Sequence, residues 1–232
     1  IKQSKDDQQL LPVLVEFLIQ QNEAFREKIR FTKEKLENFD AVIATGSNNT
    51  ARYFEYYFSK YPHIIRKNRN SVAIITGDET KEELAPLGDD IFRYYGLGCR
   101  NVSKIFVPED FQFEKLFQAI YEWNPIINQN KYANNYDYNK AVYLMSEFKL
   151  FDNGFLILKE DKSFSSPIAT LFYEKYSSLE ELNSKLTEQE EHIQCIVSQN
   201  LQPNHIEFGK TQQPKLSDFA DNVDTIQFLL NL

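Results

Sequence analysis

Three short apolar runs, separated by helical segments, constrain the fold of this chain most strongly. Residues 41–45, 71–76 and 104–107 are rich in Val, Ile, Ala and Phe, and Gly or Pro follows each run. Runs of this length without polar alternation are typical of strands buried on both faces. Because helical spacing fills the segments between them, the pattern predicts an α/β fold with a parallel sheet.

Helical signals also continue through the rest of the chain. Residues 6–29 have the spacing of an amphipathic helix. A second helical stretch over 80–95 opens with Thr80 and Glu83 at capping-box spacing, and Pro86 is expected to break it. Further helices are expected over residues 51–61, 113–123, 138–148 and 179–186, and further strands over 154–159, 168–173 and 192–198.

The composition supports a folded core and argues against several classes of protein. Phe (19) and Tyr (13) supply apolar surface, and 26 basic against 34 acidic residues give a formal charge of −8. A negative balance argues against binding of nucleic acid through its phosphates. The sequence shows no apolar run that could span a membrane and no secretory signal. Two cysteines cannot form a disulfide framework, so we expect a reducing, cytoplasmic location.

Glycine is scarce, and its positions single out one cysteine. The chain has 7 Gly, about half the usual share of roughly 7%. Gly96 and Gly98 directly precede Cys99, between a predicted helix and a predicted strand. Such a loop can present a thiol, and its backbone N–H groups can bind a developing oxyanion. Arg100 adds a positive charge beside the sulfur, which favours the thiolate. The alternative is a buried structural cysteine after a tight turn.

The second cysteine and the histidines predict no further chemistry. Cys195 lies in an alternating run typical of a strand, which predicts a packed core thiol. His192 is three residues away, and residues so spaced on a strand point to opposite faces. His63 and His205 are isolated and lack the spacing of zinc ligands, so no metal site is expected.

A Gly-Ser turn follows the first apolar run. Gly46 and Ser47 connect this strand to the next predicted helix. Free N–H groups and the dipole at a helix N-terminus can bind phosphate. The turn lacks both the Gly-x-Gly-x-x-Gly pattern and the lysine of a P-loop, so it supports nucleotide binding only weakly.

Taken together, these segments resemble one enzyme family. Residues 40–52, 68–71 and 95–103 are similar to the LuxC-type acyl-CoA reductases of the aldehyde dehydrogenase superfamily, and the Ile-Glu-Phe-Gly segment at 206–209 is similar to their C-terminal region, as are residues 213–214 and 218–221. The Gly-Leu-Gly-Cys-Arg-Asn-Val segment is specific to the family, whereas the Gly-Ser turn is shared by the superfamily. The likeness covers nearly the whole chain and implies an aldehyde-dehydrogenase-like α/β fold.

The resemblance implies a nicotinamide cofactor. It places Gly46 and Ser47 against the cofactor, and Lys2 and Ser4 against the adenosine ribose. Lys5 occupies the place where NAD-preferring relatives often carry Glu, and a cation there can pair with a 2′-phosphate. We therefore expect NADPH, with NADH as the alternative. The other interpretation of Lys5 is a solvated residue at a helix start.

One departure from the superfamily concerns water activation. Aldehyde-oxidising relatives carry a Glu ahead of the strand that precedes the cysteine loop, where it activates the water that hydrolyses the thioester. The corresponding residues 65–70 contain no carboxylate. This absence fits reduction of acyl-CoA better than oxidation of an aldehyde.

The resemblance also implies a division of the chain. Residues 1–70 are expected to be the remainder of a Rossmann-like cofactor domain, residues 71–214 the catalytic domain, and residues 215–232 a docking helix. The apolar face of that helix would carry Phe219, Val223, Ile226 and Leu230. The superfamily has strands and helices ahead of the Lys-x-Ser segment, including an Asn that completes the oxyanion hole. Because the chain lacks them, we expect a fragment of a longer enzyme.

The activity that follows is reduction of a long-chain acyl-CoA to an aldehyde. Cys99 would attack the thioester and carry the acyl group, Gly98 and Arg100 would shape the oxyanion loop, and the cofactor would supply hydride. A CoA-independent aldehyde dehydrogenase and a silent acyl-carrier subunit are the alternatives. The expected partners are acyl-CoA, an acyl-transfer protein and, by analogy, further copies of the chain.

Overall fold

The chain forms two compact units in a computed structural model, which describes residues 1–4, 8–199 and 201–232. The first unit comprises residues 1–45 and 49–65 with Leu232, and the second comprises residues 46–48 and 66–231. No described helix has both the length and the apolar character needed to cross a lipid bilayer.

The first unit contains a strand, a helix and a second strand that follow a leading helix. Its elements are α1 (Leu10–Gln21), the short 3₁₀ helix η1 (Glu23–Phe25), β1 (Val42–Thr45), α2 (Asn48–Phe58) and β2 (His63–Arg66). The N–H of Val42 donates to Pro62 O at 3.0 Å and that of Gly46 to Arg66 O at 3.1 Å, so β1 and β2 advance in the same direction.

Two expectations for this unit need correction. The helix predicted over residues 6–29 ends at Gln21, because Asn22 takes an extended backbone and its side chain accepts from the N–H of Ala24 at 3.0 Å. The strand over residues 41–45 exists as β1, but Ile43 is 44% exposed. Burial on both faces fails because β1 belongs to a sheet of only two described strands.

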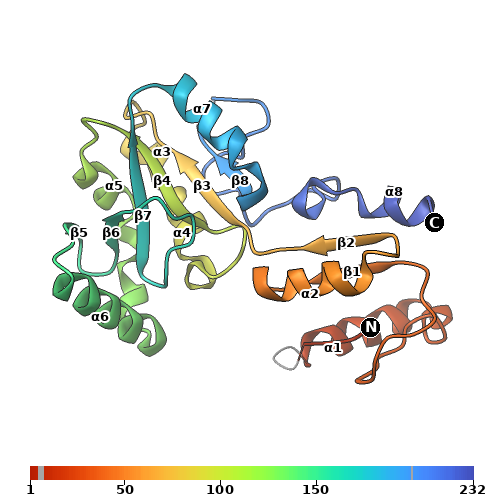
Figure 1. Ribbon diagram of the computed structural model, residues 1–232. Helices are drawn as coiled ribbons and strands as arrows, with labels where there is room; N and C mark the ends of the chain where they lie inside the picture. The colour runs from red at the N-terminus through yellow and green to blue at the C-terminus, as the bar shows by residue number, and fades with distance from the viewer. Residues whose placement is uncertain (5–7, 200) are drawn as a thin grey trace. The chain divides into compact units, whose positions relative to one another are not determined.

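The second unit is built on a six-stranded sheet of order β5-β6-β7-β4-β3-β8 (Figure 1). All its pairs are parallel except β5 with β6. The strands are β3 (Asn70–Ile74), β4 (Val102–Pro108), β5 (Leu150–Asp152), β6 (Ile157–Glu160), β7 (Thr170–Tyr176) and β8 (Ile193–Val197). The predicted α/β fold with a parallel sheet is confirmed, while β2 and β5 were not predicted.

The second unit also contains helices. They are α3 (Lys81–Leu84), α4 (Leu87–Phe92), α5 (Phe113–Ala119), α6 (Asn130–Met145), α7 (Leu179–Glu188) and α8 (Thr225–Leu230), with the 3₁₀ helices η2 (Arg93–Gly96), η3 (Tyr121–Asn128), η4 (Glu190–His192) and η5 (Ala220–Asn222). Thr80 and Glu83 form the predicted capping box, and the helical stretch breaks between α3 and α4. Pro86 lies at this break, as expected.

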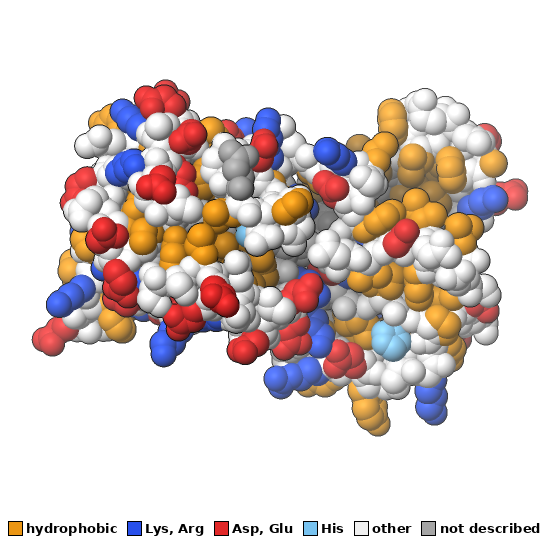
Figure 2. All heavy atoms as spheres, turned by 90° about the horizontal axis from the view of Figure 1, so that it is seen from above, with side chains coloured by type: hydrophobic (Ala, Val, Ile, Leu, Met, Phe, Trp, Pro, Cys, Tyr) orange, Lys and Arg blue, Asp and Glu red, His pale blue; other side chains and the backbone are white. Residues whose placement is uncertain are grey.

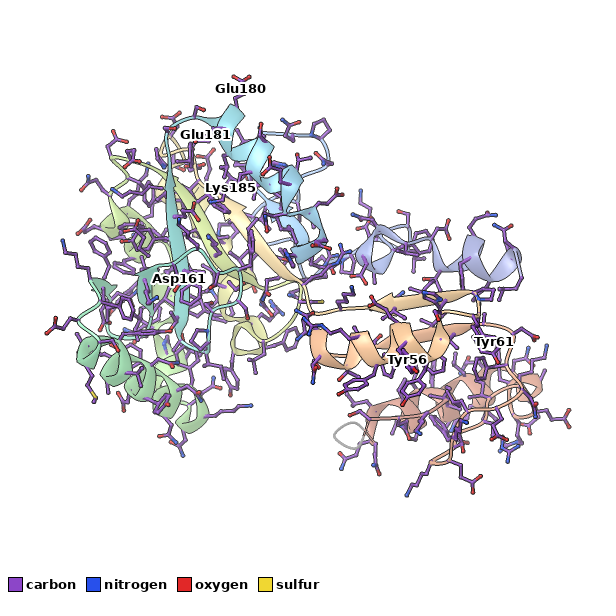
Figure 3. All side chains as sticks on the ribbon, viewed as in Figure 1. Tyr56, Tyr61, Asp161, Glu180, Glu181 and Lys185 are labelled. Atoms are coloured by element: carbon purple, nitrogen blue, oxygen red, sulfur yellow. The ribbon has the colours of Figure 1, made fainter. Side chains whose placement is uncertain are left out.

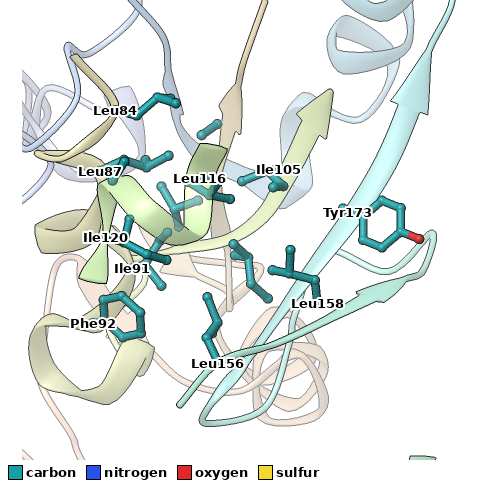
Figure 4. Packing of buried hydrophobic residues seen from close by; sticks show 14 of the residues in the cluster. Leu84, Leu87, Ile91, Phe92, Ile105, Leu116, Ile120, Leu156, Leu158 and Tyr173 are labelled. Atoms are coloured by element: carbon teal, nitrogen blue, oxygen red, sulfur yellow. The ribbon is translucent and has the colours of Figure 1, made fainter. Parts of the chain in front are cut away.

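The main core lies between the sheet and α4, α5 and α6. Figure 4 shows Ile91, Leu116 and Ile120 from the helices packed against Ile105 and Leu158 from the strands. A smaller apolar cluster on the opposite face joins Val72, Ile74 and Phe106 to α7. Both faces of the central strands are therefore apolar, which explains why their sequence runs do not alternate.

The predicted docking helix is two short pieces. Asp221 and Asn222, inside η5, both have left-handed backbones, with φ of 58° and 56°, and α8 begins only at Thr225. No residue of α8 is buried. The tail is instead held by polar contacts. Asp221 Oδ2 lies 3.9 Å from Arg66 Nε, and Asp221 Oδ1 lies 3.8 Å from Arg69 Nε. Arg66 Nη2 also donates to Thr225 Oγ1 at 3.1 Å.

A charged cluster also interrupts the smaller apolar face. The Nζ of Lys104, which is fully buried, donates to Glu174 Oε2 at 2.8 Å and to Lys162 O at 2.9 Å. Lys185 projects from α7 (Figure 3), and its Nζ donates to the same carboxylate. Burial raises the pKa of Glu174, but the hydrogen bonds from both lysines outweigh it and hold the pKa below the ordinary value.

We predict that Glu174→Gln destabilises the protein in a pH-dependent way. The lowered pKa of Glu174 means that its carboxylate stabilises the fold above its unfolded pKa of about 4.5, and that this contribution is lost as the pH falls through the folded value. At pH 7 we expect a loss of about 1 kcal/mol, because water partly screens this half-buried group. Urea unfolding from pH 7 to pH 3 measures the difference, which should vanish in acid. Glu188→Gln, at an exposed position of α7, is the matched control. A difference that stays constant with pH would contradict the assignment.

Candidate active site

Cys99 lies in the connection from η2 to β4, and its side chain is exposed. Three consecutive residues before it, Tyr94, Tyr95 and Gly96, have left-handed backbones with φ of 55°, 59° and 74°. Residues other than glycine rarely adopt this conformation, and it is concentrated at functional sites. The reversal ends the α4 helical stretch and leads directly into the turn that carries Cys99.

The buried side chain of Asn101 holds this turn together. Asn101 Oδ1 accepts from the N–H of Gly98 at 2.9 Å, and Asn101 Nδ2 donates to Asp90 O at 2.8 Å. The N–H of Asn101 in turn donates to Gly98 O at 2.9 Å. A Cβ at position 98 would lie 2.8 Å from Asn101 Oδ1, so the turn requires glycine for close approach.

The backbone N–H groups of the loop differ in whether they already have a hydrogen-bond acceptor. The N–H of Gly98 already has an acceptor, so Gly98 supports the loop rather than offering an oxyanion donor. Within the part of the chain that the structure describes, the N–H groups of Cys99 and Arg100 have no acceptor. The donors available next to the sulfur are therefore those of Cys99 and Arg100.

A buried carboxylate joins this region to a distant segment. Asp90 accepts from the N–H of Gly209 at 2.6 Å, and from the N–H and Oγ1 of Thr211 at 3.1 Å and 2.7 Å. Burial raises the pKa of Asp90, and these hydrogen bonds oppose the rise. Gly209 is required here as well, because it has φ of +79° and a Cβ would lie 2.7 Å from Pro86 Cβ.

The structure assigns Arg100 contacts that the sequence did not suggest. Its Nε donates to Thr211 O, so the segment held by Asp90 also holds Arg100. Arg100 lines a groove of about 900 Å³ together with Cys195, His205 and Lys210. Its charge lowers the pKa of Cys195, whereas burial, the larger effect, raises it. The guanidinium thus acts on the second cysteine.

The remaining sulfur and imidazole groups have structural contacts. Cys195 is buried, as predicted. His192 lies in η4, just before the strand, and its ring stacks on Phe164 with centroids 6.4 Å apart. His205 Nδ1 is 2.8 Å from Ser198 Oγ, and burial lowers the pKa of His205. No cluster of three or more potential metal ligands occurs among the described residues.

The residues expected to hold a cofactor fall in both units. Gly46 and Ser47 connect β1 to α2, and the turn is tied to residues 66–69: the N–H of Asn68 donates to Asn48 Oδ1 at 3.1 Å. Lys2 and Ser4 are exposed residues of the first unit. Lys5 lies outside the described residues.

Sequence reasoning missed the residues that support the loop. Asp90, Asn101, Thr211 and Ser71 are fully buried and polar. One signal was present for Asp90, which shares a helical face with the apolar Leu87 and Ile91. A carboxylate at a core position is rare unless it is paired. No local pattern could identify its partners, because they lie about 120 residues away in the chain.

On the face that Figure 2 shows, acidic and basic side chains are interspersed with apolar ones. This mixture agrees with the composition, since the chain has 34 acidic and 26 basic residues.

Comparisons with known proteins identify the fold. No family profile and no curated protein matches the sequence. Among solved structures, Staphylococcus aureus AldH in a substrate-bound state has 16% identity and a TM-score of 0.53, over 88% of this chain and 52% of that one. An indole-3-acetaldehyde dehydrogenase complexed with NAD⁺ has 12% identity and a TM-score of 0.51, over 71% and 41%. The aldehyde dehydrogenase KauB from Pseudomonas aeruginosa has 14% identity and a TM-score of 0.51, over 70% and 41%.

These likenesses concern the fold. The chain has an α/β architecture with a mostly parallel sheet that matches part of the aldehyde dehydrogenase structures. It spans about half of the length of these proteins or less.

We predict that Asn101→Ala destabilises the protein by about 1–3 kcal/mol for each buried group left unpaired. The substitution removes the acceptor of the Gly98 N–H and the donor to Asp90 O. Denaturant unfolding measures the loss. Asn134→Ala, at an exposed position of α6, is the matched control and should be close to neutral. Equal stability of the two variants would show that the Asn101 contacts do not hold the loop.

Proposed function

We propose that this chain is the catalytic part of a nicotinamide-dependent, LuxC-type acyl-CoA reductase that converts a long-chain acyl-CoA to an aldehyde. The observation that carries the proposal is Cys99, an exposed thiol on a glycine turn within an aldehyde dehydrogenase fold. The specific Gly-Leu-Gly-Cys-Arg-Asn-Val segment around this residue supports the narrower assignment to acyl-CoA.

The turn offers the groups that thioester cleavage needs. The Cys99 sulfur attacks the carbonyl carbon, and the collapse of the resulting tetrahedral species breaks the bond to coenzyme A, which leaves as a thiolate. The N–H groups of Cys99 and Arg100 point to a role in stabilising the oxyanion, because neither has an acceptor within the described chain. Asn101 and Asp90 keep the turn in place.

The residues present fit a nicotinamide cofactor in part. The Gly46–Ser47 turn opens the eleven-residue helix α2, whose N-terminus suits a phosphate. Lys2, Ser4 and Lys5 are proposed to hold the adenosine ribose and its 2′-phosphate. When bound, the cofactor supplies the hydride that releases the acyl group from Cys99 as an aldehyde.

The segment before β3 favours this direction of the reaction. Residues 65–70 run from β2 into β3 and contain no carboxylate that could activate water. In this proposal an acyl-cysteine at Cys99 lacks the carboxylate with which aldehyde-oxidising relatives activate water, and it can wait for hydride.

We predict a Cys99 acyl adduct that NADPH discharges. After the reduced protein is mixed with a long-chain acyl-CoA without cofactor, intact-protein mass spectrometry should show a gain of one acyl group. Cys99→Ala should abolish the gain, and Cys195→Ala should leave it unchanged. Adding NADPH should remove the adduct and produce the aldehyde.

Other outcomes distinguish the alternatives. An adduct that forms but resists NADPH indicates an acyl carrier. Steady oxidation of free aldehyde without coenzyme A indicates an aldehyde dehydrogenase. Absence of any adduct on the folded protein would overturn the role of Cys99.

A second prediction concerns the cofactor. If Lys5 pairs with a 2′-phosphate, Lys5→Ala should weaken NADPH binding by about tenfold, or ~1.4 kcal/mol, and leave NADH binding unchanged. Fluorescence titration of both cofactors measures this, with Lys28→Ala as an exposed control in the same unit. An equal loss for both cofactors would exclude a phosphate contact.

A further inference from the structure

The fold brings the two cysteines of this chain, 96 residues apart in sequence, to one end of the sheet. Ser71, at the start of β3, links them. Its hydroxyl donates to Cys99 O at 3.0 Å, and it lies near enough to Cys195 to lower the pKa of that thiol, against the larger effect of burial. The buried Ser71 therefore holds the backbone of Cys99 on one side, and β8, which carries Cys195, pairs with β3 on the other.

Strand register explains this arrangement. Ser71 pairs with Val102 of β4, three residues after Cys99. On its other side, Asn70 pairs with Ile193 of β8, two residues before Cys195, and the register shifts between Asn70 and Val72. The strands β4, β3 and β8 thus begin at the same end of the sheet (Figure 1).

The two thiols differ in access. Cys99 is exposed, so a solute meets it first. Cys195 is only 7% exposed, but it lines the wall of the 900 Å³ groove with Arg100. Burial raises the pKa of the Cys195 thiol, so Cys99 is the thiol that an oxidant reaches first.

We propose that Cys99 and Cys195 form a reversible disulfide when a peroxide oxidises Cys99. In the first step the Cys99 thiolate attacks one peroxide oxygen, the O–O bond breaks, and the departing hydroxide takes a proton to become water. Cys99 is then a sulfenic acid. In the second step the Cys195 sulfur attacks the Cys99 sulfur, the S–O bond breaks, and the hydroxide leaves as water with the thiol proton. One peroxide thereby accepts two electrons from two thiols.

The disulfide would protect Cys99 from irreversible oxidation. Sulfinic and sulfonic acids form when a sulfenic acid meets further peroxide, whereas a disulfide is returned to thiols by a dithiol. The movement needed is local, because Cys99 lies on a short turn between η2 and β4. The consequence for catalysis rests on the proposed function, since oxidation of Cys99 costs activity only if this thiol accepts the acyl group.

The test uses thiols alone and needs no substrate. The full chain is reduced, freed of reductant, treated with hydrogen peroxide and quenched with N-ethylmaleimide. Non-reducing peptide mapping should identify a linked peptide containing Cys99 and Cys195, and both thiols should disappear together. The yield should not depend on protein concentration, and dithiothreitol should restore both thiols.

Variants distinguish formation of the Cys99–Cys195 disulfide from oxidation of Cys99 alone. Cys195→Ala should leave Cys99 to accumulate sulfinic acid several-fold faster than in the wild type, and Cys195→Ser serves if the alanine variant fails to fold. Equal sulfinic acid formation in both proteins, or disulfides only between two copies, would overturn the proposal. If the linked peptide forms while no acyl adduct is found on Cys99, the disulfide stands and the proposed reductase fails.

Discussion

The buried carboxylate of Asp90 is the interaction on which the candidate site depends. It accepts three hydrogen bonds from Gly209 and Thr211, and its backbone oxygen accepts from Asn101. Through Asn101 it holds the turn of Cys99, and through Thr211 it holds the segment that binds Arg100. A buried carboxylate without these donors would carry a large desolvation cost, so the helix, the cysteine turn and the distant segment stabilise one another.

The site lies at an unusual end of the sheet. Ligands in open parallel sheets commonly bind at the carboxyl ends of strands, but Cys99 precedes β4, so its sulfur is at the amino end. The same end carries Ser71 and Cys195, because β3 and β8 begin there too. One strand end therefore gathers the exposed thiol, the buried thiol and the Arg100 guanidinium.

Sequence patterns predicted the elements whose faces are uniformly buried. The runs at 71–76 and 104–107 became the central strands β3 and β4, and the glycine-rich loop became the exposed turn of Cys99. The strands β2 and β5 were missed because the apolar run of each is only two residues long, Ile64-Ile65 and Leu150-Phe151. Such strands exist through pairing with a neighbour, which propensity does not encode.

The sequence by itself determined the alternation of helices and strands, the capping box, and the glycines that the turn before β4 requires, because each depends on residues a few positions apart. Only the tertiary structure decided where the polar contacts go. The carboxylate of Asp90 accepts from Thr211, Arg100 donates to the carbonyl of Thr211, and Ser71 donates to the carbonyl of Cys99. These contacts join segments separated by tens of residues. Their hydrogen bonds stabilise the protein only once folding has buried the polar groups away from water, where an unpaired group would be costly.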